Sequence, residues 1–288
     1  MRPRMGAACE STCYTLDVVV SSPNAAECQE AAQNPAATGP AVGLYLGLLR
    51  RCLCRDIFPD GRYEGEIDAL QRQPFDAALR EDGRDWPTDA ETMVGMKRLH
   101  NVERCCLSAI RDQTPGDFVE TGVWRGGCSI LMRAVLAASG DTQRAVWLFD
   151  SFQGLPKPDA AAFPQDEGDL LWKYSSYLGV SLADVQANFR RYDLLDERCR
   201  FVPGWFRDTI PNAGVDPIAV LRLDGDMYES TWLVLTHLYP KLSPGGYVIV
   251  DDYGAIAACK AAVEDFRAKH SITAPLAEVD WTGVFWRK

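Results

Sequence analysis

The sequence lacks the features that define several broad classes of protein. No stretch approaches the roughly 18 consecutive apolar residues of a membrane-spanning helix, and the arginines near the start are not followed by the apolar run of a secretory signal. Basic residues are outnumbered by acidic ones, 30 to 40, so the chain lacks the excess of positive charge that a nucleic-acid backbone requires. We therefore expect a cytoplasmic protein that binds neither nucleic acid nor membrane.

The cysteines also lack the spacing of a metal site, although there are ten of them. No Cys-x-x-Cys pair recurs at the spacing of a zinc site, and several cysteines fall within helical patterns. We expect buried free thiols in a reducing compartment rather than disulfides. The remaining composition, 47% hydrophobic and 24% charged, is ordinary for a globular chain of this length.

Composition and hydrophobic pattern divide the chain into residues 1–40, 41–114 and 115–288. The first part, rich in Ala, Ser, Asn and Pro, is expected to be mostly disordered, although Leu16–Val20 could form a short strand. The second part is expected to be helical, with one helix from Val42 to Ile57, then a polar linker, then a helix capped by Thr88 or Asp89.

The third part alternates short apolar segments with helical patterns, which indicates a parallel sheet with helices on both faces. The end of the chain differs, because two short apolar runs flank a turn at Trp281–Gly283 and predict an antiparallel hairpin. This layout is typical of the Rossmann-like fold of class I methyltransferases. The expected parallel strands are Asp117–Thr121, Ala145–Asp150, Cys199–Val202, Ala219–Asp224 and Gly246–Asp251.

A glycine-bearing loop joins the first of these strands to a helix, in the segment DFVETGVWRGGCS at 117–129. Open α/β sheets bind ligands at such loops, and Gly122 lets the backbone approach a ligand closely. The spacing matches neither Gly-x-Gly-x-x-Gly nor a phosphate-binding loop, so a ligand without phosphate such as S-adenosylmethionine is indicated. Glu120 could face its ammonium or sulfonium group, and Ser129 its carboxylate; a plain strand–helix turn is the alternative.

Asp150 ends the second strand and could accept hydrogen bonds from a ribose diol. This geometry serves a nicotinamide dinucleotide equally well, so the residue indicates an adenosine-type ligand and no more. Trp205 and Phe206, which follow the third strand, could stack on an adenine or could simply pack. The histidines His100, His237 and His270 are weaker candidates for catalysis.

Acidic residues end two further strands. Asp224 closes the fourth, and Asp251 and Asp252 close the fifth. Because the carboxyl ends of parallel strands share one edge of the sheet, these carboxylates should converge, and oxygen ligands without His or Cys favour Mg²⁺. Asp251 and Asp252 can share an ion only if the chain has left strand geometry, since neighbours in a strand point to opposite faces. The alternative is that these acids are solvated strand ends or helix caps.

Six ordered motifs in the sequence resemble the macrocin O-methyltransferase family, which acts on deoxysugar hydroxyls of macrolides and aminocoumarins. The resemblance covers about residues 43 to 288. The motifs are GRDWPT at 83–88, ETGVWRGG at 120–127, DSFQGLP at 150–156, GWFRDT at 204–209, LRLDGDMYEST at 221–231 and GGYVIVDDYG at 245–254.

The resemblance implies a homodimeric, Mg²⁺-dependent O-methyltransferase of a small-molecule glycoside. Asp224, Asp251 and Asp252 match the family's metal ligands, and Asp224 matches the acid proposed to take the substrate proton. From the residues themselves, either Asp224 or Asp226 could take that proton. A mobile segment that covers the site corresponds to Pro156–Tyr177. The residues expected to hold S-adenosylmethionine are Glu120, Thr121, Gly122, Ser129, Asp150 and Ser151.

The sequence is also compatible in part with three other functions. A catechol-like aromatic O-methyltransferase is the main alternative, but such enzymes place a lysine base where this chain has Met227. A nicotinamide oxidoreductase is disfavoured by the missing Gly-x-Gly-x-x-Gly and by the terminal hairpin. A binding scaffold without activity would require the loss of a metal acid or of the cofactor loop, and both are present.

Overall fold

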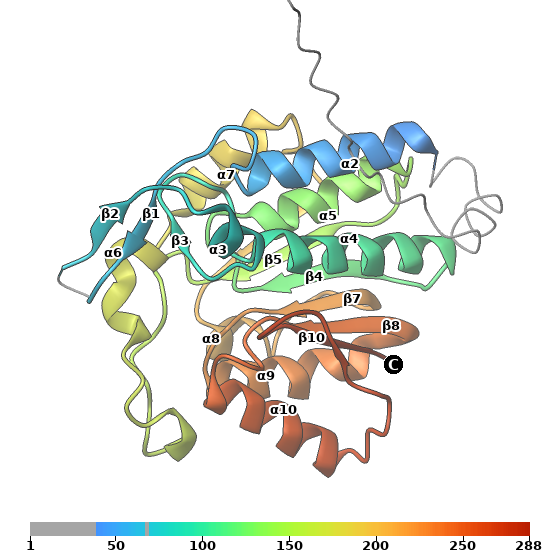
Figure 1. The fold of residues 1–288 in the computed structure, drawn as a ribbon. Helices are drawn as coiled ribbons and strands as arrows, with labels where there is room; N and C mark the ends of the chain where they lie inside the picture. The colour runs from blue at the N-terminus through green and yellow to red at the C-terminus, as the bar shows by residue number, and fades with distance from the viewer. Residues whose placement is uncertain (1–38, 67–68) are drawn as a thin grey trace, which may run out of the picture. The chain divides into compact units, whose positions relative to one another are not determined.

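A seven-stranded sheet lies at the centre of the computed structural model, which describes residues 39–66 and 69–288 (Figure 1). The strand order is β6-β5-β4-β7-β8-β10-β9. The first five strands run parallel, and β10 pairs antiparallel with both β8 and β9. This confirms the predicted parallel sheet closed by a hairpin. The strands are β4 (Asp117–Thr121), β5 (Val146–Asp150), β6 (Cys199–Pro203), β7 (Ile218–Leu223), β8 (Leu242–Val250), β9 (Ala277–Glu278) and β10 (Val284–Arg287).

Helices cover both faces of the sheet and enclose one hydrophobic core on each side (Figure 1). Successive residues of a strand point to opposite faces, and accordingly Phe118 belongs to one core and its neighbour Val119 to the other. One face carries α2 (Pro40–Leu53), α4 (Gly95–Arg111), α5 (Gly127–Ala138) and α7 (Leu182–Arg191). The other carries α8 (Phe206–Thr209), α9 (Tyr228–Leu238) and α10 (Ala257–Lys269), with η4 (Tyr239–Lys241) after α9.

The region between α2 and α4 is more structured than the sequence indicated. Instead of a polar linker, the chain forms a small antiparallel sheet in the order β2-β1-β3 and a short helix. These elements are β1 (Arg62–Glu64), β2 (Gln71–Gln73), α3 (Ala77–Glu81) and β3 (Trp86–Pro87). A second group of short elements follows β5: η2 (Pro164–Asp166), η3 (Leu171–Tyr174) and α6 (Ser175–Leu178).

The expected helix cap at Thr88 or Asp89 is wrong, because α4 begins only at Gly95. The carboxylate of Asp60 explains the difference. Its Oδ2 accepts hydrogen bonds from the amides of Asp89 and Ala90, at 2.6 and 3.0 Å, and so holds this stretch in a turn. The first helix also ends earlier than expected, at Leu53.

The prediction of buried free thiols is confirmed for the part of the chain that the structure describes. All seven cysteines there are free, and all except Cys52 are buried. No helix among these residues is long and apolar enough to cross a membrane. The predicted disorder of residues 1–40 and the possible strand at Leu16–Val20 lie almost entirely outside the described residues.

Arg80 of α3 is a buried charge that holds the small sheet to the rest of this region. Its Nε donates to Asp85 at 2.9 Å and its Nη1 to Asp60 at 2.6 Å. Nη1 also donates to the carbonyl of Cys54 just after α2, at 2.7 Å. Because Gly83–Trp86 line a cavity at the carboxyl edge of the sheet, this network holds in place a stretch of the chain that borders that cavity.

We predict that Arg80→Ala destabilises the protein by about 3–5 kcal/mol, because it leaves two buried carboxylates without their partner. Chemical denaturation monitored by circular dichroism measures the change. Arg51→Ala is the matched control, since Arg51 pairs with Asp56 on the surface. It should cost less than about 1 kcal/mol. Equal stability losses in the two variants would contradict a structural role for Arg80.

Candidate active site

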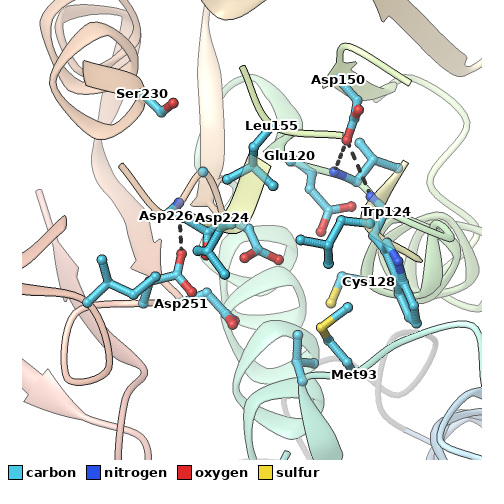
Figure 2. A pocket seen from close by; sticks show the side chains of 18 of the residues that line it. Met93, Glu120, Trp124, Cys128, Asp150, Leu155, Asp224, Asp226, Ser230 and Asp251 are labelled. Atoms are coloured by element: carbon cyan, nitrogen blue, oxygen red, sulfur yellow. Dashed lines mark hydrogen bonds between the residues drawn. The ribbon is translucent and has the colours of Figure 1, made fainter. Parts of the chain in front are cut away.

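A cavity of about 330 Å³ opens where β4, β5, β7 and β8 end (Figure 2). Strand order reverses between β4 and β7, and open α/β sheets bind ligands at such a point. The wall includes Gly83–Trp86 and Glu91–Val94 from the N-terminal region, and Gly154–Pro156 from the segment after β5. The volume and position suit a small-molecule site.

The glycine loop after β4 runs against the end of β7. Gly122 has φ +88°, and a Cβ atom there would lie 1.7 Å from the carbonyl oxygen of Asp224. Only glycine combines this backbone conformation with such a close approach. The loop then enters α5 through Gly126, whose φ is +91°.

Glu120 lines the cavity, whereas Thr121 and Ser129 are fully buried behind the wall. The Glu120 carboxylate accepts hydrogen bonds from the Ser129 hydroxyl and from Nη1 of Arg222, the latter at 2.7 Å. Burial raises the pKa of Glu120 to about 7, against the opposing effect of Arg222. Ser129 therefore orients Glu120, and the Thr121 hydroxyl donates to the carbonyl of Arg222.

Asp150 braces the glycine loop. Its Oδ2 accepts the amide hydrogens of Val123 and Trp124 at 2.7 and 3.3 Å (Figure 2), and its Oδ1 accepts that of Phe152 at 2.6 Å. Burial raises its pKa, and these amides oppose the rise. Ser151 also lines the cavity and donates to the carbonyl of Gly154 at 2.7 Å.

Asp224, Asp251 and Asp252 converge as the sequence predicted. Each offers a carboxylate oxygen, and the three atoms lie within 4.8 Å of one another. Strand β8 ends at Val250, so the two neighbouring aspartates have left strand geometry and point to the same place. Figure 2 shows Asp224 and Asp251 near each other on the cavity wall.

Two arginines that the sequence analysis missed hold these acids. Arg222, buried in β7, donates through Nη1 to Asp224 at 2.8 Å and through Nη2 to Asp251. Arg98 of α4 donates to the other oxygen of Asp251 and, at 3.0 Å, to Asp280. Arg222 could have been suspected, because it is a lone charge in the otherwise apolar strand IAVLRL. Arg98 offered no comparable signal, because its partners are far away in sequence.

A further acid, Asp226, lines the cavity beside the cluster. It has φ +60°, and its amide donates to Oδ2 of Asp252 at 3.2 Å. Burial, together with the neighbouring carboxylates, raises the pKa of both Asp226 and Asp252 well above the ordinary value. Burial also raises the pKa of Asp224 to about 6; Arg222 opposes this rise and Asp251 adds to it.

The charges of this edge of the cavity do not balance. Five carboxylates line it, and two guanidinium groups, those of Arg98 and Arg222, line it or contact them. The surplus of negative charge and the all-oxygen donor set are what a hard divalent cation neutralises. The residues present therefore fit Mg²⁺. The five acids are Glu120, Asp224, Asp226, Asp251 and Asp252.

The weaker candidates from the sequence differ in whether they line the cavity. Trp205 and Phe206 line the cavity, as a contact with an adenine would require. The three histidines do not line it, and His100 is exposed on α4.

Comparisons with known proteins agree with this geometry. The sequence profile described as macrocin-O-methyltransferase (TylF) matches residues 45–288. The chain belongs to the macrocin-O-methyltransferase family. It is an O-methyltransferase, and its fold is that of enzymes that use S-adenosylmethionine.

Two curated members of the family are close in sequence. The chain is 51% identical over 255 residues to 8-demethyl-8-(2,3-dimethoxy-alpha-L-rhamnosyl)-tetracenomycin-C 4'-O-methyltransferase of Streptomyces olivaceus, covering 87% of this chain and 94% of the relative. It is 48% identical over 249 residues to mycinamicin III 3''-O-methyltransferase of Micromonospora griseorubida, covering 86% and 97%. Among solved structures, the O-methyltransferase NovP is 48% identical with a TM-score of 0.81, covering 86% of this chain and 99% of that one.

We predict that Gly122→Ala lowers the affinity for S-adenosylmethionine by at least about 100-fold, because the loop must move away from β7 to admit a Cβ atom. Isothermal titration with S-adenosylmethionine measures the loss. Gly140→Ala is the matched control: Gly140 also has positive φ, +66°, but a Cβ there meets nothing within 4 Å. Wild-type affinity in Gly122→Ala would show that the loop does not hold the methyl donor.

Proposed function

We propose that this family member transfers the methyl group of S-adenosylmethionine to a hydroxyl of a sugar, commonly a deoxysugar, on a natural product such as a macrolide. The observation that carries the proposal is the convergence of Asp224, Asp251 and Asp252 beside the glycine loop. The proposal includes a homodimer, and a division of the chain into an extension (1–40), an N-terminal region that helps to line the site (41–114) and a catalytic domain (115–288).

The methyl donor is assigned to the part of the cavity between β4 and β5. Glu120 faces its positively charged end, a role that suits a buried carboxylate without a full complement of cationic partners. Asp150 accepts from the ribose, because it lines the cavity at the end of β5, beside the glycine loop. Gly122 gives the ligand room, Ser151 lines the site, and Thr121 and Ser129 support it from behind.

The acceptor hydroxyl is assigned to the acidic part of the cavity. Asp224, Asp251 and Asp252 would hold Mg²⁺, whose charge lowers the pKa of a nearby hydroxyl. Asp224 is the base that takes the hydroxyl proton, because it lines the cavity in the acidic part where the acceptor is assigned. The acceptor oxygen bonds to the methyl carbon as the sulfur–methyl bond breaks, which leaves S-adenosylhomocysteine.

A sugar acceptor is supported by the relatives, since the tetracenomycin enzyme is named for a substrate that carries a rhamnosyl group. The alternative is a catechol-like aromatic acceptor. Met227, where such enzymes place a lysine base, is 1% exposed and does not line the cavity. This chain therefore offers a carboxylate base and no lysine at that point, which favours the sugar.

We predict that Asp252→Asn lowers kcat/KM by at least about 100-fold, because it removes one ligand of the charge that stabilises the transition state. A radiolabelled methyl-transfer assay measures the loss, and isothermal titration should show S-adenosylmethionine bound within about twofold of wild type, because its proposed contacts are elsewhere. Asp56→Asn, a change in a surface acid, is the control. Chelation should abolish wild-type activity and added Mg²⁺ restore it; full turnover in excess chelator would exclude the metal.

We further predict that the enzyme methylates a glycosylated macrolide and leaves catechols unmodified, because the acidic cavity presents a carboxylate base in place of a lysine. A panel of glycosylated macrolides, free sugars and catechols, assayed by mass spectrometry at equal concentrations, tests this. Preference for catechols would support the aromatic alternative.

A further inference from the structure

The segment between β5 and α7 contains a buried acidic residue whose neighbours in the sequence are exposed to solvent. Leu155, Pro156, Leu171 and Leu178 of this segment line the cavity, so residues 155–178 form part of its cover. Asp166 lies in the middle and is 1% exposed, although the residues on either side of it are exposed. A carboxylate buried at such a place requires specific partners.

Those partners are the first two amides of α9. Oδ1 of Asp166 accepts the amide hydrogen of Tyr228 at 2.6 Å, and Oδ2 accepts that of Glu229 at 3.0 Å. The helix has no cap of its own, because Met227 at its N-cap makes no side-chain hydrogen bond. Asp166 therefore caps α9 from a position 62 residues earlier in the chain, and a negative charge at a helix N-terminus is favourable. The Phe163 ring, 6.1 Å from that of Tyr228, adds a second contact.

The loop 224–227, here called the acidic loop, joins β7 to the capped first turn of α9. A Cβ atom on Gly225 would lie 2.9 Å from Cβ of Ser230, so the loop is packed directly against the first turn of α9. Asp226, next in the loop, donates its amide to Asp252. A shift of this first turn would therefore move Asp224 and Asp226, and would break the hydrogen bond to Asp252.

We propose that Asp166 is a positioning residue that ties the cover of the cavity to the acidic loop. When residues 155–178 lie over the cavity, Asp166 caps α9 and holds Asp224 and Asp252 in place; when they move away, α9 loses its cap and the loop loosens. The effect on catalysis rests on the proposed function, whereas the tie between the two segments does not.

Hydrogen–deuterium exchange of the protein without metal or methyl donor tests the tie directly. Asp166→Ala should speed exchange by about tenfold both in residues 155–178 and in residues 224–229, because a lost cap weakens both sides of the contact. Asp76→Ala is the matched control, since Asp76 also accepts two first-turn amides, those of Ala78 and Leu79 in α3. Its effect should be confined to α3.

The second measurement is isothermal titration of the protein with Mg²⁺, which gives its affinity for the metal. Asp166→Ala should weaken Mg²⁺ binding by about tenfold and leave the affinity for S-adenosylmethionine within about twofold. Asp166→Asn keeps one acceptor oxygen, so its effect on both measurements should be intermediate. This variant also preserves the test if Asp166→Ala does not fold.

The two measurements distinguish the tie between the two segments from the proposed metal site. Faster exchange confined to residues 228–229, with residues 155–178 unchanged, would overturn the tie. Wild-type Mg²⁺ affinity in Asp166→Ala, where the wild-type protein binds Mg²⁺, would overturn the role of Asp166 in positioning the acids. Linked exchange in a protein that binds no Mg²⁺ would uphold the tie and overturn the proposed metal site.

Discussion

Arg222 holds the carboxyl edge of the sheet together. It lies in the middle strand β7 and is fully buried. It donates to carboxylates at or near the ends of three strands: Glu120 in β4, Asp224 after β7 and Asp251 after β8. A buried guanidinium is costly unless it is paired, and three clustered carboxylates are costly unless they are neutralised. The guanidinium and the carboxylates therefore reduce each other's energetic cost of burial. The arrangement also ties the two halves of the cavity, because one side chain contacts both the methyl-donor part and the acidic part.

The carboxylates at this edge are not fully paired with guanidinium groups. Arg98 adds a second positive charge from α4, yet five carboxylates remain against two guanidinium groups. A purely structural network would balance its charges, since surplus buried charge destabilises the fold. Burial raises the pKa values of Asp224, Asp226 and Asp252, which reflects the cost of holding these carboxylates together. The Mg²⁺ proposed above would offset part of that cost.

The sequence predicted the sheet well because a buried parallel strand is a short apolar run, and the acids were found because they end such runs. Prediction from the sequence failed where a contact with a distant part of the chain determines the local structure. β1 and β2 have the polar sequences RYE and QRQ and are only three residues long, so they show no alternation. Thr88 and Asp89 match the pattern of a helix cap, but the Asp60 carboxylate accepts the amide hydrogens of Asp89 and Ala90 and holds the stretch in a turn. Arg98 could not be placed from sequence, because Asp251 is 153 residues away.

Asp60, Asp150 and Asp166 perform one task at three places in the chain, and of the three Asp150 lines the cavity. Each accepts at least two backbone amides from another part of the chain, and so holds an irregular segment whose amides would otherwise lack partners. Their oxygens are largely occupied, whereas those of Asp224 and Asp252 face one another and accept few bonds from the chain. The amides that these three acids accept thus fix the segments that they contact. Asp150 differs from the other two, because it braces the glycine loop and also lines the cavity itself.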